Sequence, residues 1–158
     1  MENNTYVYIL KDTLIKKNSL LDKLMELTQL QGKYLSEPEP DMESFEEMIS
    51  KKDTYIMQIN QLDEGFEKIF GYVKEELTAK KAEYKEIILL LQDLIRKITD
   101  KSTKLEVMER QNKARLELYF GAKKKEIKNF KLSSKTVANY YKNMFQPTSE
   151  SFFIDKKK

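Results

Sequence analysis

Five apolar residues near the C-terminal end of the chain have types and spacing suited to binding another protein. They follow one another at positions i, i+3, i+4, i+7 and i+8, and are Val137, Tyr140, Tyr141, Met144 and Phe145. This spacing places them on one face of a short amphipathic helix. Such a face packs against an amphipathic helix of a partner. These five are the candidate partner-binding residues.

The sequence leaves open what covers this apolar face. It either packs back on the rest of the chain or receives a helix from another protein. Burying one Val- or Met-sized side chain contributes about 1.5–3 kcal/mol, and ordering the backbone costs about 1–2 kcal/mol per residue. These terms nearly cancel over the segment, so we expect docking or a partner to order it. The closing run 151–154, Ser-Phe-Phe-Ile, is expected to form a second exposed apolar cluster.

The residue types also limit the reactions that the chain could catalyse. It contains no histidine and no cysteine, so zinc sites, catalytic dyads and redox pairs that need imidazole or thiolate are excluded. No glycine-rich phosphate loop and no nucleophile elbow is present. Its carboxylates alternate with lysines, as on solvated helix faces. We therefore expect no enzyme activity, no catalytic residue, no cofactor and no metal.

Charge is divided unevenly along the chain. Residues 123–158 hold ten lysines and three acidic residues, a net charge of +7 (10 − 3), whereas residues 1–122 carry −4 (19 − 23). A basic segment with aromatic residues can bind nucleic acid. However, residues 123–158 lack arginine, which is best suited to grip phosphate. Because the acidic part would also repel a polyanion, we expect no nucleic-acid partner.

Three long helices are expected to precede this C-terminal segment, near residues 5–35, 42–77 and 82–120. In each, mostly apolar residues recur every 3.5 positions, the pattern of helices that pack along one another. The first row is Val7, Leu10, Leu14, Lys17, Leu21, Leu24, Thr28, Gln31 and Leu35. The second is Phe45, Ile49, Lys52, Ile56, Ile59, Asp63, Phe66, Phe70, Val73 and Leu77. The third is Tyr84, Ile88, Leu91, Ile95, Ile98, Ser102, Leu105, Glu109, Asn112, Leu116 and Tyr119.

The fold class that follows is all-α. Pro38 and Pro40 end the first helix, because proline lacks a backbone donor and fixes φ. Asp41 is the expected N-cap of the second helix. We predict an elongated antiparallel three-helix bundle or coiled coil over residues 1–130. A basic, tyrosine-bearing tail with a short amphipathic helix follows over residues 131–158.

The rows also predict how the second and third helices are aligned. If these helices fold back on one another, Leu77 pairs with Tyr84, and the same register sets Lys52 opposite Glu109. Gly65 and Gly71 lie within the second helix. Two readings of them remain: glycines tolerated on a solvated face, or positions where a partner backbone comes close.

The sequence gives no sign of membrane insertion or export by a signal peptide. The longest aliphatic run, residues 87–91, is far shorter than the roughly 20 residues needed to span a bilayer. The first residues, Met-Glu-Asn-Asn, lack the basic and apolar regions of a signal peptide. We expect a cytoplasmic protein.

Several short sequence runs on these helices, with polar residues at characteristic positions, resemble those of FlgN-type flagellar export chaperones. In the first two helices they are the runs 21–28, 51–53, 62–67 and 73–77, for example Leu-Asp-Glu-Gly-Phe-Glu at 62–67. The third helix carries Leu-Gln-Asp-Leu-Ile at 91–95 and Glu-Arg-Gln-Asn-Lys at 109–113. The resemblance covers roughly residues 10–130 and rests on helical spacing plus these runs.

The resemblance implies a cytoplasmic chaperone of the flagellar type III export system. Such chaperones bind hook–filament junction proteins, which are also called hook-associated proteins, prevent their premature aggregation and bring them to the export gate. The family uses its C-terminal segment for contacts, and the tail here is similar in kind. The alternatives are a structural coiled-coil adaptor without an export role and a secreted helical substrate. The oligomeric state stays open.

Overall fold

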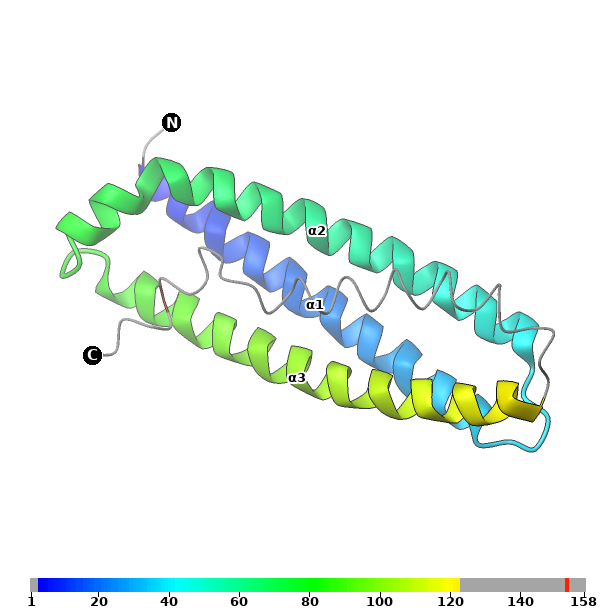
Figure 1. Cartoon of the computed structure of the whole chain (residues 1–158). Helices are drawn as coiled ribbons and strands as arrows, with labels where there is room; N and C mark the ends of the chain where they lie inside the picture. Colours follow the sequence, from blue (N-terminus) through cyan, green and yellow to red (C-terminus); the bar gives the residue numbers. More distant parts are fainter. Residues whose placement is uncertain (1–2, 123–152, 154–158) are drawn as a thin grey trace. The chain divides into compact units, whose positions relative to one another are not determined.

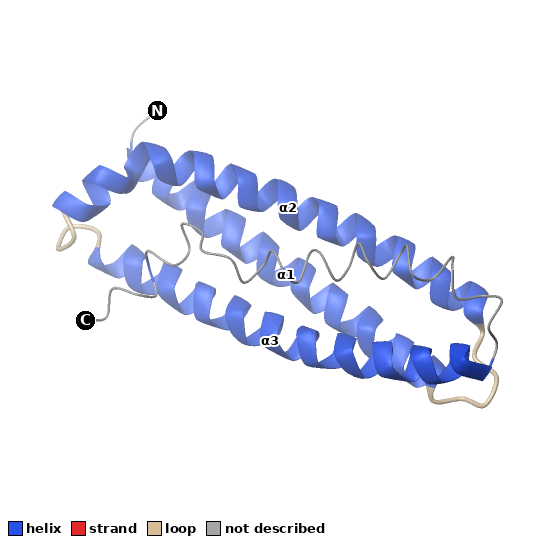
Figure 2. Cartoon of the chain, viewed as in Figure 1, coloured by secondary structure: helices blue, strands red, loops and turns tan. Residues whose placement is uncertain are grey.

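The computed structural model describes residues 3–122 and Phe153, and its regular structure is helical (Figure 2). Helix α1 spans Asn3–Leu35, α2 spans Met42–Ala79 and α3 spans Lys85–Ala122, in the order that Figure 1 colours from blue to yellow. No strand occurs in the part of the chain that the structure describes. The prediction of an all-α, three-helix fold is confirmed.

The described residues divide into two compact units. The first unit contains residues 3–21, 58–100 and Phe153, and the second contains residues 22–57 and 101–122. Each unit therefore receives one segment from each of the three helices.

In the first unit, the contacts between α1 and α2 run in opposite directions along the two helices. Tyr6 and Tyr72 place their ring centroids 5.1 Å apart. Further along α1, the ammonium nitrogen of Lys17 lies 2.8 Å from a carboxylate oxygen of Asp63 on α2. Residue numbers that rise on α1 fall on α2, so these segments are antiparallel.

In the second unit, the predicted register between α2 and α3 is confirmed. Lys52 forms its ion pair with Glu109. One end of the same interface packs Leu116 and Tyr119 against a core cluster of Phe45 and Ile49. Antiparallel pairing is therefore established here by both polar and apolar contacts.

The heptad rows are the residues that the structure buries. Every member of the first row from Val7 to Gln31 is buried, and Leu35 at its end is half-buried. In the second row only Asp63 is half-buried, and all other members are buried. In the third row the members from Leu91 to Leu105 and Asn112 are buried, whereas the others are half-buried. The period of 3.5 residues thus identified the core.

Local signals set where the helices begin and end. The loop that contains Pro38 and Pro40 separates α1 from α2. Asp41 caps α2 as predicted: the backbone N–H and the hydroxyl of Ser44 donate to its carboxylate at 3.3 and 2.7 Å. These hydrogen bonds stabilise the ionised form and lower the pKa of Asp41 below 3.8. A turn over residues 80–84 then joins α2 to α3, so α3 begins three residues later than the expected position 82.

The structure separates the helical glycines by their surroundings. A Cβ added at Gly65 or Gly71 meets no atom within 4 Å, as expected for a solvated face. At Gly32, by contrast, a Cβ would lie 3.1 Å from the side-chain oxygen of Asn112 and 3.2 Å from a guanidinium nitrogen of Arg115. Close approach therefore occurs at Gly32 of α1, which the sequence pattern did not single out.

Alanine is expected to stabilise the chain at Gly65 and Gly71 but not at Gly32. Alanine is favoured over glycine inside a helix by about 1 kcal/mol, and nothing obstructs the methyl group at the two α2 positions. Urea unfolding followed by circular dichroism should show this gain for Gly65→Ala and Gly71→Ala. Gly32→Ala should gain less or lose stability. An equal gain at all three positions would mean that Asn112 and Arg115 move aside freely.

Candidate functional site

The predicted partner-binding residues, Val137, Tyr140, Tyr141, Met144 and Phe145, lie outside the described residues. One residue of the tail, Phe153, is described. The sequence predicted that it lies in an exposed apolar cluster, and it does not belong to the predicted partner-binding face. Phe153 packs back on the helices.

Phe153 is only 1% exposed and lies against aromatic rings of α2. Its ring centroid is 5.5 Å from that of Phe70 and 6.3 Å from that of Phe66, with interplanar angles of 61° and 74°. These edge-to-face arrangements are favoured by the ring quadrupoles. From α3, the side-chain amide of Gln92 donates a hydrogen bond of 2.9 Å to the backbone carbonyl of Phe153. The expectation that run 151–154 forms an exposed cluster was wrong for Phe153, because two aromatic rings bury it.

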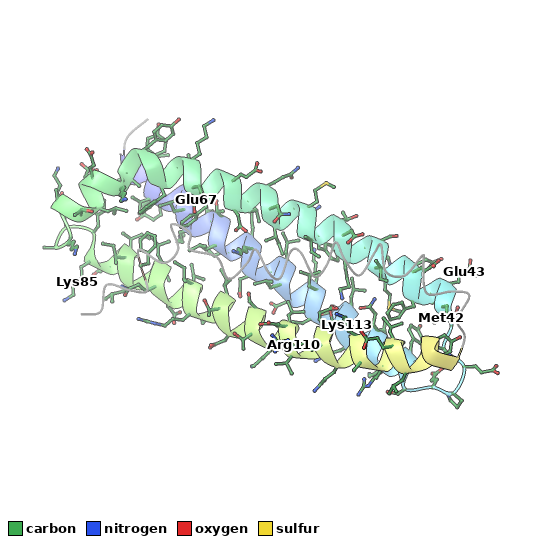
Figure 3. All side chains as sticks on the ribbon, in the orientation of Figure 1. Met42, Glu43, Glu67, Lys85, Arg110 and Lys113 are labelled. Carbon is green, nitrogen blue, oxygen red and sulfur yellow. The ribbon has the colours of Figure 1, made fainter. Side chains whose placement is uncertain are left out.

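A small open pocket continues from Phe153 along the ends of α2 and α3. Its volume is about 200 Å³, and it is lined by Leu77, Lys81, Lys85, Ile88, Leu89, Gln92 and Phe153. Lys85, at the start of α3, is labelled in Figure 3. Leu89 is 54% exposed although its side chain lines this pocket. We call Phe66, Phe70, Gln92 and this pocket together the Phe153 site.

The second unit contains a buried polar network centred on Lys52. Its side chain is 1% exposed. The ammonium group pairs with Glu109 of α3 and also donates to the side-chain oxygen of Gln31 on α1 at 2.9 Å. The hydroxyl of Thr28 lies 3.1 Å from the same Glu109 oxygen. One lysine thus joins all three helix segments of this unit.

A second polar layer lies one turn further along α3. The side-chain amide of Asn112 donates to the backbone oxygen of Thr28 at 3.0 Å, and Arg115 donates to the backbone oxygen of Gly32 at 3.3 Å. Both hydrogen bonds run from α3 to the backbone of α1. The missing side chain of Gly32 is what leaves room for them.

Burial and the carboxylate act in opposite directions on Lys52. Burial lowers the pKa of Lys52 below its ordinary value of 10.5, and the charge of Glu109 partly offsets this by raising it. A buried charge with hydrogen-bonded partners is tolerated, whereas one without them is costly. The network therefore satisfies the buried ammonium group of Lys52 with partners from α1 and α3.

Among residues 3–122 and Phe153, no group of three or more acidic side chains is placed to hold a metal ion. Within the same residues, every helix is too short or too polar to cross a membrane. On the exposed face of α3, ion pairs join Lys97 to Asp93 and Arg110 to Glu106.

Sequence reasoning placed the pair Lys52 and Glu109 correctly and missed the Phe153 site. The pair followed from two aligned heptad rows. No comparable signal connects Phe153 to α2, because more than eighty residues separate it from Phe66 and Phe70 and no period links them. The one hint was composition: the second row carries two phenylalanines four residues apart, where most other members are aliphatic.

One comparison with known proteins returned a match. The family model described as FlgN protein matches residues 6–144, which is most of the chain. No curated protein and no solved structure matches. The match covers all three helices from Tyr6 onward and extends past the last described residue of α3 into the tail. The chain therefore belongs to the FlgN family of flagellar export chaperones.

Proposed function

We propose that this chain binds hook-associated proteins in the cytoplasm, keeps them from aggregating and delivers them to the flagellar export apparatus. Family membership supports a chaperone role in flagellum biogenesis. A chaperone for export must meet its client before the client leaves the cell, which places it in the cytoplasm. The client class and the delivery step are the parts that we add.

The observation that carries this proposal is where the family match ends. It stops at residue 144, so it includes Val137, Tyr140, Tyr141 and Met144, and only Phe145 of the predicted face lies just beyond it. The amphipathic spacing of these residues therefore falls within the part of the chain that is similar to the family. We infer that this face receives an amphipathic helix of the client.

Three alanines in the tail are expected to abolish client binding while leaving the helices folded. The variant carries Tyr140→Ala, Tyr141→Ala and Met144→Ala. Aromatic side chains at the centre of an interface each cost about 2 kcal/mol or more when truncated. Affinity for a hook-associated protein should then fall by more than a hundredfold. Isothermal titration calorimetry measures the affinity, and light scattering shows whether the client still aggregates.

A matched control is available on α3. Leu118 is an apolar residue of the described helices with 80% exposure. Leu118→Ala should leave client binding unchanged. If Leu118→Ala removes binding and the tail variant keeps it, the client site lies on the helices. If neither variant changes the affinity of a bound client, the proposed face is wrong, and if the wild-type chain binds no hook-associated protein, the client class is wrong.

A further inference from the structure

We propose that the Phe153 site is a peptide-binding site, and that the C-terminal segment of this chain is an exchangeable ligand in it. The inference does not depend on the client proposed above. It rests on the contacts that Phe153 makes in the first unit and on the pocket beside it.

Phe153 is held in the way that peptide ligands are held. One aromatic side chain is buried against Phe66 and Phe70. A polar contact comes from the side-chain amide of Gln92, which donates a hydrogen bond to the main-chain carbonyl of Phe153. An apolar anchor plus a hydrogen bond to the backbone recognises a segment without requiring one particular sequence. Another segment with an aromatic side chain could therefore make the same contacts.

Covalent linkage explains why the chain's own segment occupies the site. Thirty residues, 123–152, connect the end of α3 to Phe153. Because Phe153 and the site belong to one chain, binding between them is intramolecular, and its effective concentration is set by the linker rather than by the protein concentration. A single aromatic anchor is then enough to keep the site occupied in cis, and a peptide in solution must compete with it.

The open pocket indicates what else a ligand would carry. Its volume of about 200 Å³ is below the roughly 300–1,000 Å³ of sites for small molecules, so it suits one apolar side chain. Lys81 and Lys85 lie on its wall, and neither forms an ion pair with a described residue. The favoured ligand is therefore a peptide with an aromatic anchor, an adjacent aliphatic residue and a carboxylate.

The chain's own sequence supplies this chemistry. Residues 153–155 read Phe-Ile-Asp, which is an aromatic, an aliphatic and an acidic residue in succession. A ligand that displaces Phe153 would release this residue from Phe66, Phe70 and Gln92.

The test uses the full-length chain carrying Phe153→Ala, which empties the site, and a fluorescein-labelled synthetic peptide of residues 147–158. Fluorescence anisotropy should show the peptide binding to Phe153→Ala, and at least about tenfold more weakly to the wild type, whose site is occupied in cis. The matched control is Phe152→Ala, which removes the neighbouring aromatic residue and should bind the peptide as weakly as the wild type.

Two further arms test the chemistry of recognition. A peptide carrying Phe153→Ala keeps Phe152 and should not bind the emptied chain. Adding Lys81→Gln and Lys85→Gln to Phe153→Ala should weaken the normal peptide severalfold, since both cations on the pocket wall are gone. Equal binding of the two peptides would contradict the claim that Phe153 is the side chain that anchors the peptide. Unchanged affinity after loss of both lysines would contradict the claim that the site prefers a ligand with a carboxylate.

Because the chain contains no tryptophan, Phe153→Trp provides an independent reporter. Its emission should be blue-shifted when docked, and excess peptide should shift it to the red. If Phe153→Ala instead loses its helical circular dichroism, or if no peptide binds it, the proposal is overturned, because Phe153 is then a fixed part of the core.

Discussion

Replacing Glu109 with alanine is expected to lower the free energy of unfolding by up to about 3–5 kcal/mol, because it leaves the buried Lys52 without its partly exposed carboxylate partner. The variant leaves the ammonium group of Lys52 in a site where its side chain is 1% exposed. Gln31 remains a hydrogen-bond partner, but an amide does not balance a positive charge. Urea unfolding of the full chain, followed by circular dichroism, measures the loss.

A double-mutant cycle isolates the pair from other effects of truncation. Lys52→Met keeps most of the length of the side chain and removes its charge. Lys52→Met combined with Glu109→Ala should be more stable than Glu109→Ala alone by about 1–3 kcal/mol, because no charge is then left buried without a partner. Additive effects of the two substitutions would contradict a direct interaction.

The pH dependence of stability should carry the same signature. Burial lowers the pKa of folded Lys52 below 10.5, so between those two pKa values the unfolded chain holds the proton more often than the folded one. The free energy of unfolding contributed by Lys52 therefore rises with pH in that window, which ends near 10.5. The difference in unfolding free energy between wild type and Lys52→Met should therefore change as the pH is raised toward 10.5. Glu109→Ala should extend this change to lower pH, because Glu109 raises the pKa of Lys52.

Replacing Phe66 with alanine should also cost about 3–5 kcal/mol, as expected when a large aromatic residue is truncated in a core. Phe66 is 2% exposed. Its ring lies 6.4 Å from that of Phe70 and 6.3 Å from that of Phe153, centroid to centroid. The substitution therefore removes one helix core residue and one of the two rings that pack against Phe153.

The two consequences of Phe66→Ala are measured separately. Urea unfolding gives the stability, and the emission of a Phe153→Trp background reports whether residue 153 stays docked. We expect both the loss of stability and a red shift of the emission under conditions where the helices remain folded. Phe66→Leu, which keeps an apolar side chain of similar reach, should lose less of each. A destabilised variant with unchanged emission would mean that Phe70 and Gln92 hold Phe153 without Phe66.

The helices and their core could be predicted from the sequence because each signal is local. A row such as Val7, Leu10 and Leu14 specifies a buried helix face before any partner is known, since residues spaced by three and four share one side of a helix. The break at Pro38 and the cap at Asp41 depend on neighbouring residues alone. The contact between Lys52 and Glu109 could also be predicted, because the short turn at residues 80–84 fixes which residues of α2 and α3 face each other.

Contacts between residues far apart in the chain required the tertiary structure. Gly32 looks like any other glycine in a helix until Asn112 and Arg115 of α3 are placed against it. In the sequence, Thr28 and Gln31 are only polar interruptions of an apolar row. In the structure they lie within hydrogen-bond distance of Glu109 on α3 and Lys52 on α2. Phe153 belongs to no periodic pattern, so its burial against Phe66 and Phe70 is decided by shape and apolar contact in the folded chain. The sequence determined which residues lie on the buried face of each helix, because that depends on local periodicity. The tertiary structure alone decided which distant residues contact one another across these faces.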